Sequence, residues 1–444
     1  MEVKVPIAVK KDVSGLQETN LLYYEDPYLR DFEAEVLKAA VFEEISYIVL
    51  DRTSFFPEGG GQLGDSGHLI GSSGKGKVVD TQAVDGVVVH IAAAGGRGLE
   101  EGDTVRGVID WDIRYERMKQ HTGSHVLFAA IKRVLGLDGL MYMGVQIRED
   151  ASRIDISHGR PIPQSQLREV ERLSNKVCLE NRKVKTWSTT REEAERTYGQ
   201  QLGITETTPS GAVRVVEVEG WDVALCSGTH VRSTAEIGLI SILDRFRLKK
   251  GVERIEFTAG RHAYRRYDEA LAALTDLARI LNTSTDEVPA RVEHLLRERE
   301  DLKRELRAAR DRLIDVEARR LLDQAEAIGE FRLLRKKLSK VDATSLKRIA
   351  SSLVEEDPRL VVVLGSDAGS KAFLVGAAGE LAVEKVINMA ETIRGAAQVI
   401  QGGGGGSRRL AQAGGKALGL LEEALNLYAE EVSARLRGEK KARP

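Results

Sequence analysis

Two short segments of this 444-residue chain contain side chains that could bind a metal ion. Residues 120–125 contain His121 and His125, and residues 226–230, much later in the chain, contain Cys226 and His230. Each segment places two potential ligands four positions apart. Thiolate and imidazole are the ligands that zinc prefers in proteins. We therefore expect His121, His125, Cys226 and His230 to bind one Zn²⁺ ion.

Local structure must bring these four side chains together. Apolar residues with helical spacing predict a helix from Ile113 that ends at Gly136, and residues four apart on a helix share one face. Cys226 follows residues 222–225, which are expected to be the end of a buried strand. Gly228 permits a turn that could bring Cys226 and His230 to the point faced by the two helical histidines.

The ligand set leaves the role of the metal open. Four protein ligands fill a tetrahedral zinc, and closed sites of this kind are usually structural. Catalysis would need a weak ligand, five-coordination or a water molecule held by the substrate. Zinc could lower the pKa of a bound water to about 7. Otherwise the ion would mainly orient the amino group or carbonyl of a substrate.

Composition narrows the class of protein. The hydrophobic share of 42% and the charged share of 30% are typical of globular proteins. Only two cysteines are present, and the sequence contains neither a signal peptide nor a long apolar run, so we expect a cytoplasmic protein without a membrane span. The net charge of −2 argues against a generally basic nucleic-acid-binding protein, but it allows a local basic patch.

Residues 1–112 are predicted to form a small β-barrel. Strands are expected over 44–50, 77–80, 86–91 and 103–110, with one helix around 28–40. Within this part, Gly59, Gly60 and Gly61 precede Gln62. A glycine run lets the backbone come close to a ligand and expose its N–H groups. The alternative is a mobile hairpin tip.

The next two parts differ in pattern. Residues 113–260 are predicted to be an α+β domain, with helices over 164–181 and 191–198 and strands over 213–218 and 237–243. Residues 261–335 are predicted to be a helical hairpin or coiled coil with a break at 282–289. This segment either packs only on itself or forms a dimer contact. The apolar positions that support it are Leu295, Leu302, Leu306, Ala309, Leu313 and Val316.

The last part, 340–444, is predicted to be a separate α/β domain. Strands are expected over 359–364 and 371–375, and helices over 382–393 and 416–436. Residues 401–415 between the helices form a low-complexity loop with five consecutive glycines, followed by Arg408 and Arg409. The loop could be a flexible connector or a contact for phosphate or an RNA backbone. The predicted fold class is therefore α+β multidomain, with a barrel, a zinc domain, a coiled coil and an α/β domain.

These motifs together resemble a known family. The two ligand pairs, residues 56–62 and Val231 resemble the editing domain of alanyl-tRNA synthetases, and most closely the AlaX alanyl-tRNA editing proteins. Residues 402–406 and 411–415 resemble the DHH-associated domain at the end of alanyl-tRNA synthetases. The combination is similar to the long form of AlaX and covers essentially the whole chain.

The resemblance implies a zinc-dependent aminoacyl-tRNA deacylase. Its expected substrate is tRNA(Ala) mischarged with serine or glycine, and correctly charged Ala-tRNA(Ala) would be spared. Because the chain starts directly with the barrel, we expect hydrolysis without ATP and no ability to charge tRNA. The C-terminal domain, including Arg408 and Arg409, would bind the tRNA body. A homodimer through the C-terminal region is also expected.

The resemblance also assigns roles around the metal. Gly59, Gly60 and Gly61 would shape the pocket for the 3′-terminal aminoacyl-adenosine, with Gln62 as a catalytic residue beside it. Thr53 would sense the serine hydroxyl, because a buried group built to bond a hydroxyl is left unpaired by alanine. The alternative for Thr53 is a strand-end residue that satisfies local backbone groups.

Three other functions compete with this one. A DHH-type phosphodiesterase would need an Asp-His-His metal motif, which the sequence lacks. A threonyl-tRNA editing domain uses similar zinc motifs, but the glycine-rich C-terminal domain argues against it. A non-catalytic tRNA-binding protein with a structural zinc remains the alternative.

Overall fold

The computed structural model describes residues 5–93, 98–137, 140–202 and 211–438. The chain divides into two compact units, Met1–Leu277 and Ala278–Pro444. The finer division into four domains stays a prediction. Within the described residues, no helix is both long and apolar enough to cross a membrane.

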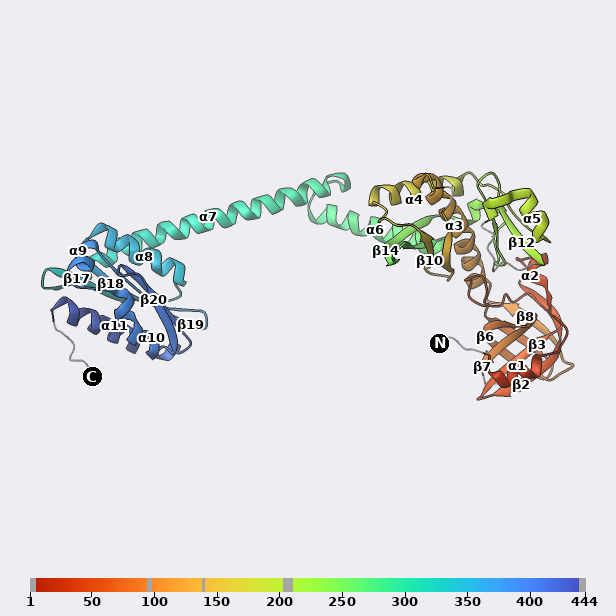
Figure 1. Cartoon of the computed structure of the whole chain (residues 1–444), viewed down its shortest axis with the longest axis horizontal. Coiled ribbons are helices and arrows are strands. Elements are labelled where there is room, and N and C mark those ends of the chain that lie inside the picture. Colours follow the sequence, from red (N-terminus) through yellow and green to blue (C-terminus); the bar gives the residue numbers. More distant parts are fainter. Residues whose placement is uncertain (1–4, 94–97, 138–139, 203–210, 439–444) are drawn as a thin grey trace. The chain divides into compact units, whose positions relative to one another are not determined.

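The first part of unit 1 is a closed β-barrel of six strands in the order β2-β3-β7-β6-β5-β8 (Figure 1). The predicted barrel is therefore confirmed. Its interior is filled by apolar side chains from successive strands, among them Val36, Ile48 and Leu69. The elements of this part are α1 (Ile7–Val13), β1 (Asn20–Leu21), α2 (Leu22–Glu25), β2 (Asp31–Phe42), β3 (Ile45–Leu50), β4 (Arg52–Thr53), β5 (Gly67–Gly71), β6 (Lys75–Val84), β7 (Val87–Ala93) and β8 (Thr104–Ile109).

The helix predicted around residues 28–40 is wrong, because strand β2 occupies most of that range. Phe32, Ala34 and Val36 are buried, whereas the residues between them are exposed. This alternation is the burial pattern of a strand that packs one face on a core. Pairing with β3 and β8 closes the barrel and overrides the helical preference of the alanines and glutamates in this stretch.

The second part of unit 1 is built around α3 (Trp111–Leu135), which is buried over most of its length. The predicted end of this helix is confirmed, since Gly136 adopts the left-handed conformation with φ 64°. One sheet has the strand order β14-β15-β10-β9 and a smaller one the order β11-β12-β13. The elements are β9 (Tyr142–Gln146), β10 (Ser152–Ser157), α4 (Gln164–Leu179), β11 (Val184–Thr190), α5 (Arg191–Tyr198), β12 (Ala212–Val218), β13 (Asp222–Leu225), β14 (Ile240–Lys249) and β15 (Val252–Ala259).

Two long helices follow, α6 (Arg261–Ile280) and α7 (Val288–Leu322), with the predicted break between them. Pro289 lies in the first turn of α7, where its missing N–H costs no helical hydrogen bond. Along α7, five of the six apolar positions of the predicted coiled coil are exposed, among them Leu302 by 57%, Leu306 by 70% and Leu313 by 66%, whereas Ala309 is half-buried. The described chain therefore leaves this apolar row uncovered.

The C-terminal part of unit 2 is built around a six-stranded sheet of order β16-β17-β18-β19-β21-β20. Alternate residues of β18 face opposite sides of this sheet. Val361 and Val363 pack with α10 and α11, whereas Val362 packs with α8. The elements are β16 (Glu326–Ile328), β17 (Phe331–Lys337), α8 (Ala343–Glu356), β18 (Leu360–Ala368), β19 (Lys371–Ala378), α9 (Glu380–Lys385), α10 (Met389–Val399), β20 (Gly402–Gly406), β21 (Leu410–Gly415) and α11 (Leu421–Leu436).

Three predictions for unit 2 need correction. The low-complexity loop over 401–415 is a hairpin, because β20 pairs along its length with β21 at the edge of the sheet. The helix expected over 382–393 is split, since the side chain of Asn388 caps a new helix by accepting from the Ala390 N–H. Helix α8 is absent from the sequence-based prediction, and the sheet begins at β16, before residue 340.

Candidate metal centre

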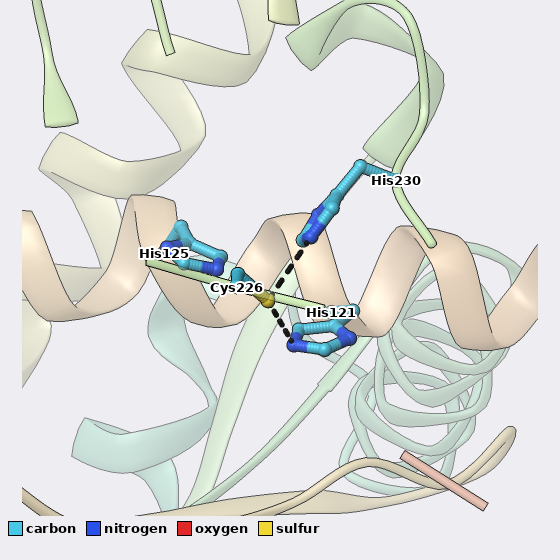
Figure 2. A group of neighbouring side chains, drawn as sticks. All are labelled: His121, His125, Cys226 and His230. Carbon is cyan, nitrogen blue, oxygen red and sulfur yellow. Dashed lines mark hydrogen bonds between the residues drawn. The ribbon is translucent and has the colours of Figure 1, made fainter. Parts of the chain in front are cut away.

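Helix α3 presents His121 and His125 on one face, as their spacing requires (Figure 2). Cys226 and His230 come from the turn that follows β13 and lie against the same face. The Cys226 Sγ is 3.2 Å from the His121 Nε2 and 3.3 Å from the His230 Nε2. One ligand atom from each of the four residues lies within 4.8 Å of all the others.

The separations of 3.2 and 3.3 Å are close to those in a zinc site, and the whole group spans no more than 4.8 Å. With metal–ligand distances of 2.0–2.3 Å, neighbouring ligand atoms of a tetrahedral zinc are about 3.4–3.6 Å apart. The thiolate and three imidazoles are the donor set that zinc favours. The four residues are buried or half-buried, so an ion held by them would be largely shielded from solvent.

The turn that carries Cys226 is held by backbone contacts and by close packing. The Cys226 N–H donates to the carbonyl of Arg214 on β12, and the Arg214 Nη1 donates to the carbonyl of Gly228. A Cβ atom at Gly228 would overlap the ring of His121. The predicted need for glycine here therefore has a specific cause, which is the close approach of the turn to a ligand ring.

The ring of His121 is oriented by Gln62, which is fully buried. The Gln62 Oε1 lies 2.8 Å from the His121 Nδ1 and also accepts from the Thr229 N–H, while its Nε2 donates to the Thr229 hydroxyl. Because these bonds identify the oxygen of the Gln62 amide, the His121 Nδ1 must be the donor. Its Nε2 is then free to bind a metal ion.

Hydrogen bonds at Nδ1 also orient the other two histidines, His125 and His230. The His125 Nδ1 lies 3.1 Å from a carboxylate oxygen of Asp222, and a carboxylate oxygen accepts. The His230 Nδ1 lies 3.2 Å from the Thr122 hydroxyl, whose single hydrogen is donated to the Met118 carbonyl. Each Nδ1 is therefore a donor, and all three imidazoles offer Nε2 to one point.

The electrostatics of the centre favour a thiolate. Burial alone would raise the pKa of the Cys226 thiol, but the adjacent His121 and His230 outweigh it and hold that pKa well below its ordinary value. A thiolate is the form that binds a metal.

The glycines of residues 59–61 form a tight turn beside this centre. Gly59 and Gln62 exchange backbone hydrogen bonds of 3.0 and 2.9 Å, and Gly60 and Gly61 between them have φ of 58° and 81°. A Cβ at Gly60 would lie 2.9 Å from the Ser227 Oγ, next to Cys226. The segment is thus a hairpin tip packed against the turn that carries two ligands.

Thr53 ends the short strand β4, which pairs with β1, and it is fully buried. Its hydroxyl accepts from the Phe55 N–H at 3.1 Å and donates to the His90 Nε2 at 2.8 Å, since the His90 Nδ1 donates to the Ile48 carbonyl. Burial lowers the pKa of His90 to about 4, which keeps this ring neutral. The Thr53 hydroxyl thus both donates and accepts a hydrogen bond within the protein, which favours the structural alternative for this residue.

Arg408 and Arg409 belong to unit 2, at the turn between β20 and β21. The Arg408 Nη2 donates to the Val383 carbonyl at 3.3 Å, and both arginines are exposed. Sequence reasoning missed Thr122, Asp222 and Thr229, which orient ligands or hold Gln62. Their only signal is position, because each lies within four residues of a predicted ligand.

Comparison with protein families matches three segments of the chain. Residues 9–113 match the model of class II (A) tRNA synthetases. Residues 213–256, which include Cys226 and His230, match the second additional domain of threonyl and alanyl tRNA synthetases. Residues 331–434 match the DHHA1 domain.

Curated relatives match nearly the whole chain. The alanine–tRNA ligase of Methanopyrus kandleri is 35% identical over 428 residues, which are 96% of this chain and 46% of the relative. The alanine–tRNA ligase of Pyrococcus abyssi is 36% identical, over 93% of this chain and 44% of the relative. The chain thus spans about half the length of the curated relatives it matches.

Solved structures with similarity to part of the chain include one domain of an alanyl-tRNA synthetase. The C-Ala domain of Aquifex aeolicus alanyl-tRNA synthetase is 34% identical, over 24% of this chain and 97% of that chain, with a TM-score of 0.23. The DHHA1 match over residues 331–434 confirms the predicted resemblance of the C-terminal region.

Proposed function

Because the chain belongs to a family related to alanyl-tRNA synthetases, we propose that it is a zinc-dependent aminoacyl-tRNA deacylase. Its substrate is tRNA(Ala) mischarged with serine or glycine, its reaction is hydrolysis of the ester without ATP, and Ala-tRNA(Ala) is spared. The observation that carries the proposal is the convergence of three Nε2 atoms and one thiolate beside a glycine turn.

The four ligands, His121, His125, Cys226 and His230, hold the ion. A bound zinc would polarise the ester or amino group of the substrate, or lower the pKa of a water molecule to about 7. Gln62 is a positioning residue in this proposal, because it acts through the ring of His121. The Asp222 carboxylate and the Thr122 hydroxyl hold the other two rings in the same way.

The glycine turn supplies the substrate pocket. The backbone at Gly60 approaches the turn of Cys226 so closely that a Cβ there would lie 2.9 Å from the Ser227 Oγ, and Gly61 is packed as closely against Val145. The 3′-terminal aminoacyl-adenosine would lie against this backbone. Thr53 discriminates serine in this proposal only if a substrate hydroxyl replaces its hydrogen bond to His90.

Unit 2 is proposed to bind the tRNA body and to form the homodimer. Arg408 and Arg409 follow a strand whose glycines are exposed, which favours contact with phosphates. The exposed leucines of α7 offer an apolar row for a second copy of the chain. In these roles the protein acts on tRNA in the cytoplasm.

One observation favours a second candidate function. The four side chains would fill every position of a tetrahedral zinc, as in structural zinc sites. A non-catalytic tRNA-binding protein with a structural zinc would show this same geometry, so an assay must separate the two.

The test is hydrolysis of seryl-, glycyl- and alanyl-tRNA(Ala) by the full chain, with and without a chelator. We expect release of serine or glycine, little release of alanine, and loss of activity with the chelator. Cys226→Ala should lower hydrolysis at least about 100-fold, because it removes both a ligand and the negative charge at the centre.

Cys178→Ala is the matched control, since this cysteine is buried in the core and lies outside the ligand set. It should keep the activity. If the wild-type chain binds tRNA but hydrolyses none of the three substrates, the non-catalytic alternative is correct.

A further inference from the structure

The hairpin formed by β14 and β15 is basic and faces solvent, and it contributes no side chain to the metal centre. Residues 245–254 contain five cationic side chains and one acidic side chain, although the whole chain has a net charge of −2. The cations are Arg245, Arg247, Lys249, Lys250 and Arg254. A local excess of this size creates a positive potential that the chain average conceals.

The hairpin extends into solvent at its tip. Strand β14 is an edge of its four-stranded sheet, and residues 246–249 are all exposed, on both faces of the strand. Phe246 is 38% exposed and Leu248 is 42% exposed. The two-residue turn is Lys250-Gly251, in which Gly251 supplies the left-handed conformation with φ 80°.

Two arginines of the hairpin are held in place by one carboxylate. Glu253 is fully buried and accepts from the Arg245 Nη1 at 3.3 Å and from the Arg247 Nε at 3.4 Å. The Arg247 Nη2 also donates to the Gly159 carbonyl at 3.0 Å. One carboxylate cannot neutralise both guanidinium groups, so the pair keeps a positive charge in a fixed place.

The tip adds further charge, part of which Asp155 compensates, since its carboxylate accepts from Arg254 at 2.7 Å and interacts with Lys249. Among the described residues, Lys250 forms no ion pair, and it stands next to Lys249 at the turn. Phe246 lies between two arginines in sequence, and the Arg254 guanidinium is 5.9 Å from the centre of its ring. The tip therefore combines cations with an exposed aromatic side chain, which is the combination used to bind RNA phosphates and bases.

A simpler role must be weighed against binding. Charged residues on an edge strand prevent pairing with other strands, and lysine is the usual choice. That role explains Lys249 but not Phe246 and Leu248, because exposed apolar side chains beside an open edge favour association. The same apolar side chains would also suit an anionic membrane surface.

We propose that the β14–β15 hairpin is an RNA-backbone contact within unit 1, in which Arg247, Lys249 and Lys250 neutralise phosphates and Phe246 packs on an unpaired base. The inference rests on the proposed function, because it takes the substrate of the metal centre to be a tRNA. It gives unit 1 its own contact with the RNA, separate from any contact made by unit 2.

The experiment compares Lys249→Gln/Lys250→Gln with wild type in the full chain. Binding to an uncharged tRNA(Ala) transcript is measured at several salt concentrations. We expect a roughly tenfold loss of affinity at low salt and a salt slope reduced by about 2, because each lysine neutralises one phosphate. Lys249→Arg/Lys250→Arg should restore both, because the charge is retained.

A matched control is Lys75→Gln/Lys77→Gln on β6, which removes the same charge from exposed positions of the barrel. It should change neither affinity nor slope. Phe246→Ala provides a variant that keeps the charge, and we expect about tenfold weaker binding with an unchanged slope.

Three outcomes overturn the proposal. The first is unchanged RNA binding by the lysine variant, and the second is an equal effect of the control. The third is a variant that aggregates, or loses binding to phosphatidylserine vesicles, while its RNA binding stays intact.

The results that would overturn the proposed deacylase function differ from those that would overturn the hairpin contact. A wild-type chain that binds tRNA through this hairpin but hydrolyses no mischarged tRNA would overturn the deacylase and support the hairpin contact. If the lysine variant hydrolyses Ser-tRNA(Ala) normally and binds tRNA with unchanged affinity, the result supports the deacylase and overturns the hairpin contact.

Discussion

The chain contains two glycine runs, and they do opposite things. Gly60 and Gly61 in unit 1 have positive φ angles and turn the backbone within one hairpin tip. The run Gly402–Gly406 in unit 2 is extended and forms strand β20 at a sheet edge. The first run packs against the turn of a metal ligand, whereas the second is exposed along its whole length.

The difference shows that a glycine run has no single meaning. At Gly61 a side chain is excluded twice, by the φ of 81° and by the Val145 carbonyl, which a Cβ would approach to 2.5 Å. In β20 the constraint alternates along the strand. A Cβ at Gly404 would lie 2.7 Å from that of Ala413, but one at Gly403 or Gly405 would meet nothing within 4 Å.

The largest effect is expected from a glycine that touches a ligand. Gly228→Ala places a methyl group on the ring of His121, so the ring must leave its position. We expect metal affinity to fall more than about 100-fold, because a ligand and its partner Gln62 are displaced together. Metal content and competition with a chelator measure this.

Gly211→Ala is the control for that variant, since nothing lies within 4 Å of the added Cβ. Normal metal affinity in Gly228→Ala would mean that the turn does not have to approach His121.

The next effect tests the glycine turn itself. Gly61→Ala combines a strained φ with a contact to the Val145 carbonyl, and we expect the free energy of unfolding of unit 1 to fall by about 2–3 kcal/mol. Chemical denaturation measures it. Gly251→Ala has nearly the same φ, 80°, but open space around its Cβ, so it should lose less. Equal losses would show that the contact with Val145 is unimportant.

A smaller effect is expected at Asp222, which contacts a candidate ligand through one hydrogen bond. Asp222→Asn keeps an acceptor for the His125 Nδ1 but removes its charge. Metal affinity should fall by about tenfold, at the lower end of the range for such partners. Asp85→Asn, on the exposed β6–β7 turn, should leave metal affinity unchanged. An Asp222→Asn variant with wild-type affinity would contradict the proposed orienting role.

The smallest effect is expected within β20, where it tests whether the constraint on the glycines alternates along the strand. Gly403→Ala should change the free energy of unfolding of unit 2 by no more than about 0.5 kcal/mol, because its Cβ enters open space. Gly404→Ala should cost about 1–2 kcal/mol, since its Cβ crowds that of Ala413. Equal costs would show that the two sides of the strand do not differ as described.

Prediction from sequence succeeded where local pattern decides the structure. The helical spacing of apolar residues and Gly136 predicted both the body and the end of α3. It failed for β2, because a helix was expected around residues 28–40 but the barrel required a strand there. It also failed for β20, because a strand without side chains has no alternating pattern and depends on its partner β21.

For the metal centre, sequence predicted the ligands but not what orients them. Gln62 was expected beside the substrate, and the structure places its amide on the back of His121. The sequence pattern identifies Asp222 only as part of a strand, yet this residue fixes His125. A hydrogen bond between residues 97 positions apart leaves no local pattern from which it could be predicted.

The sequence by itself determined the chemistry available to this protein, since residue type and a spacing of four suffice to specify two pairs of candidate metal ligands. Only the tertiary structure decided which nitrogen each imidazole offers and which glycine run lies beside them. Those choices depend on contacts between segments far apart along the chain, and packing, rather than local preference, brings such segments together.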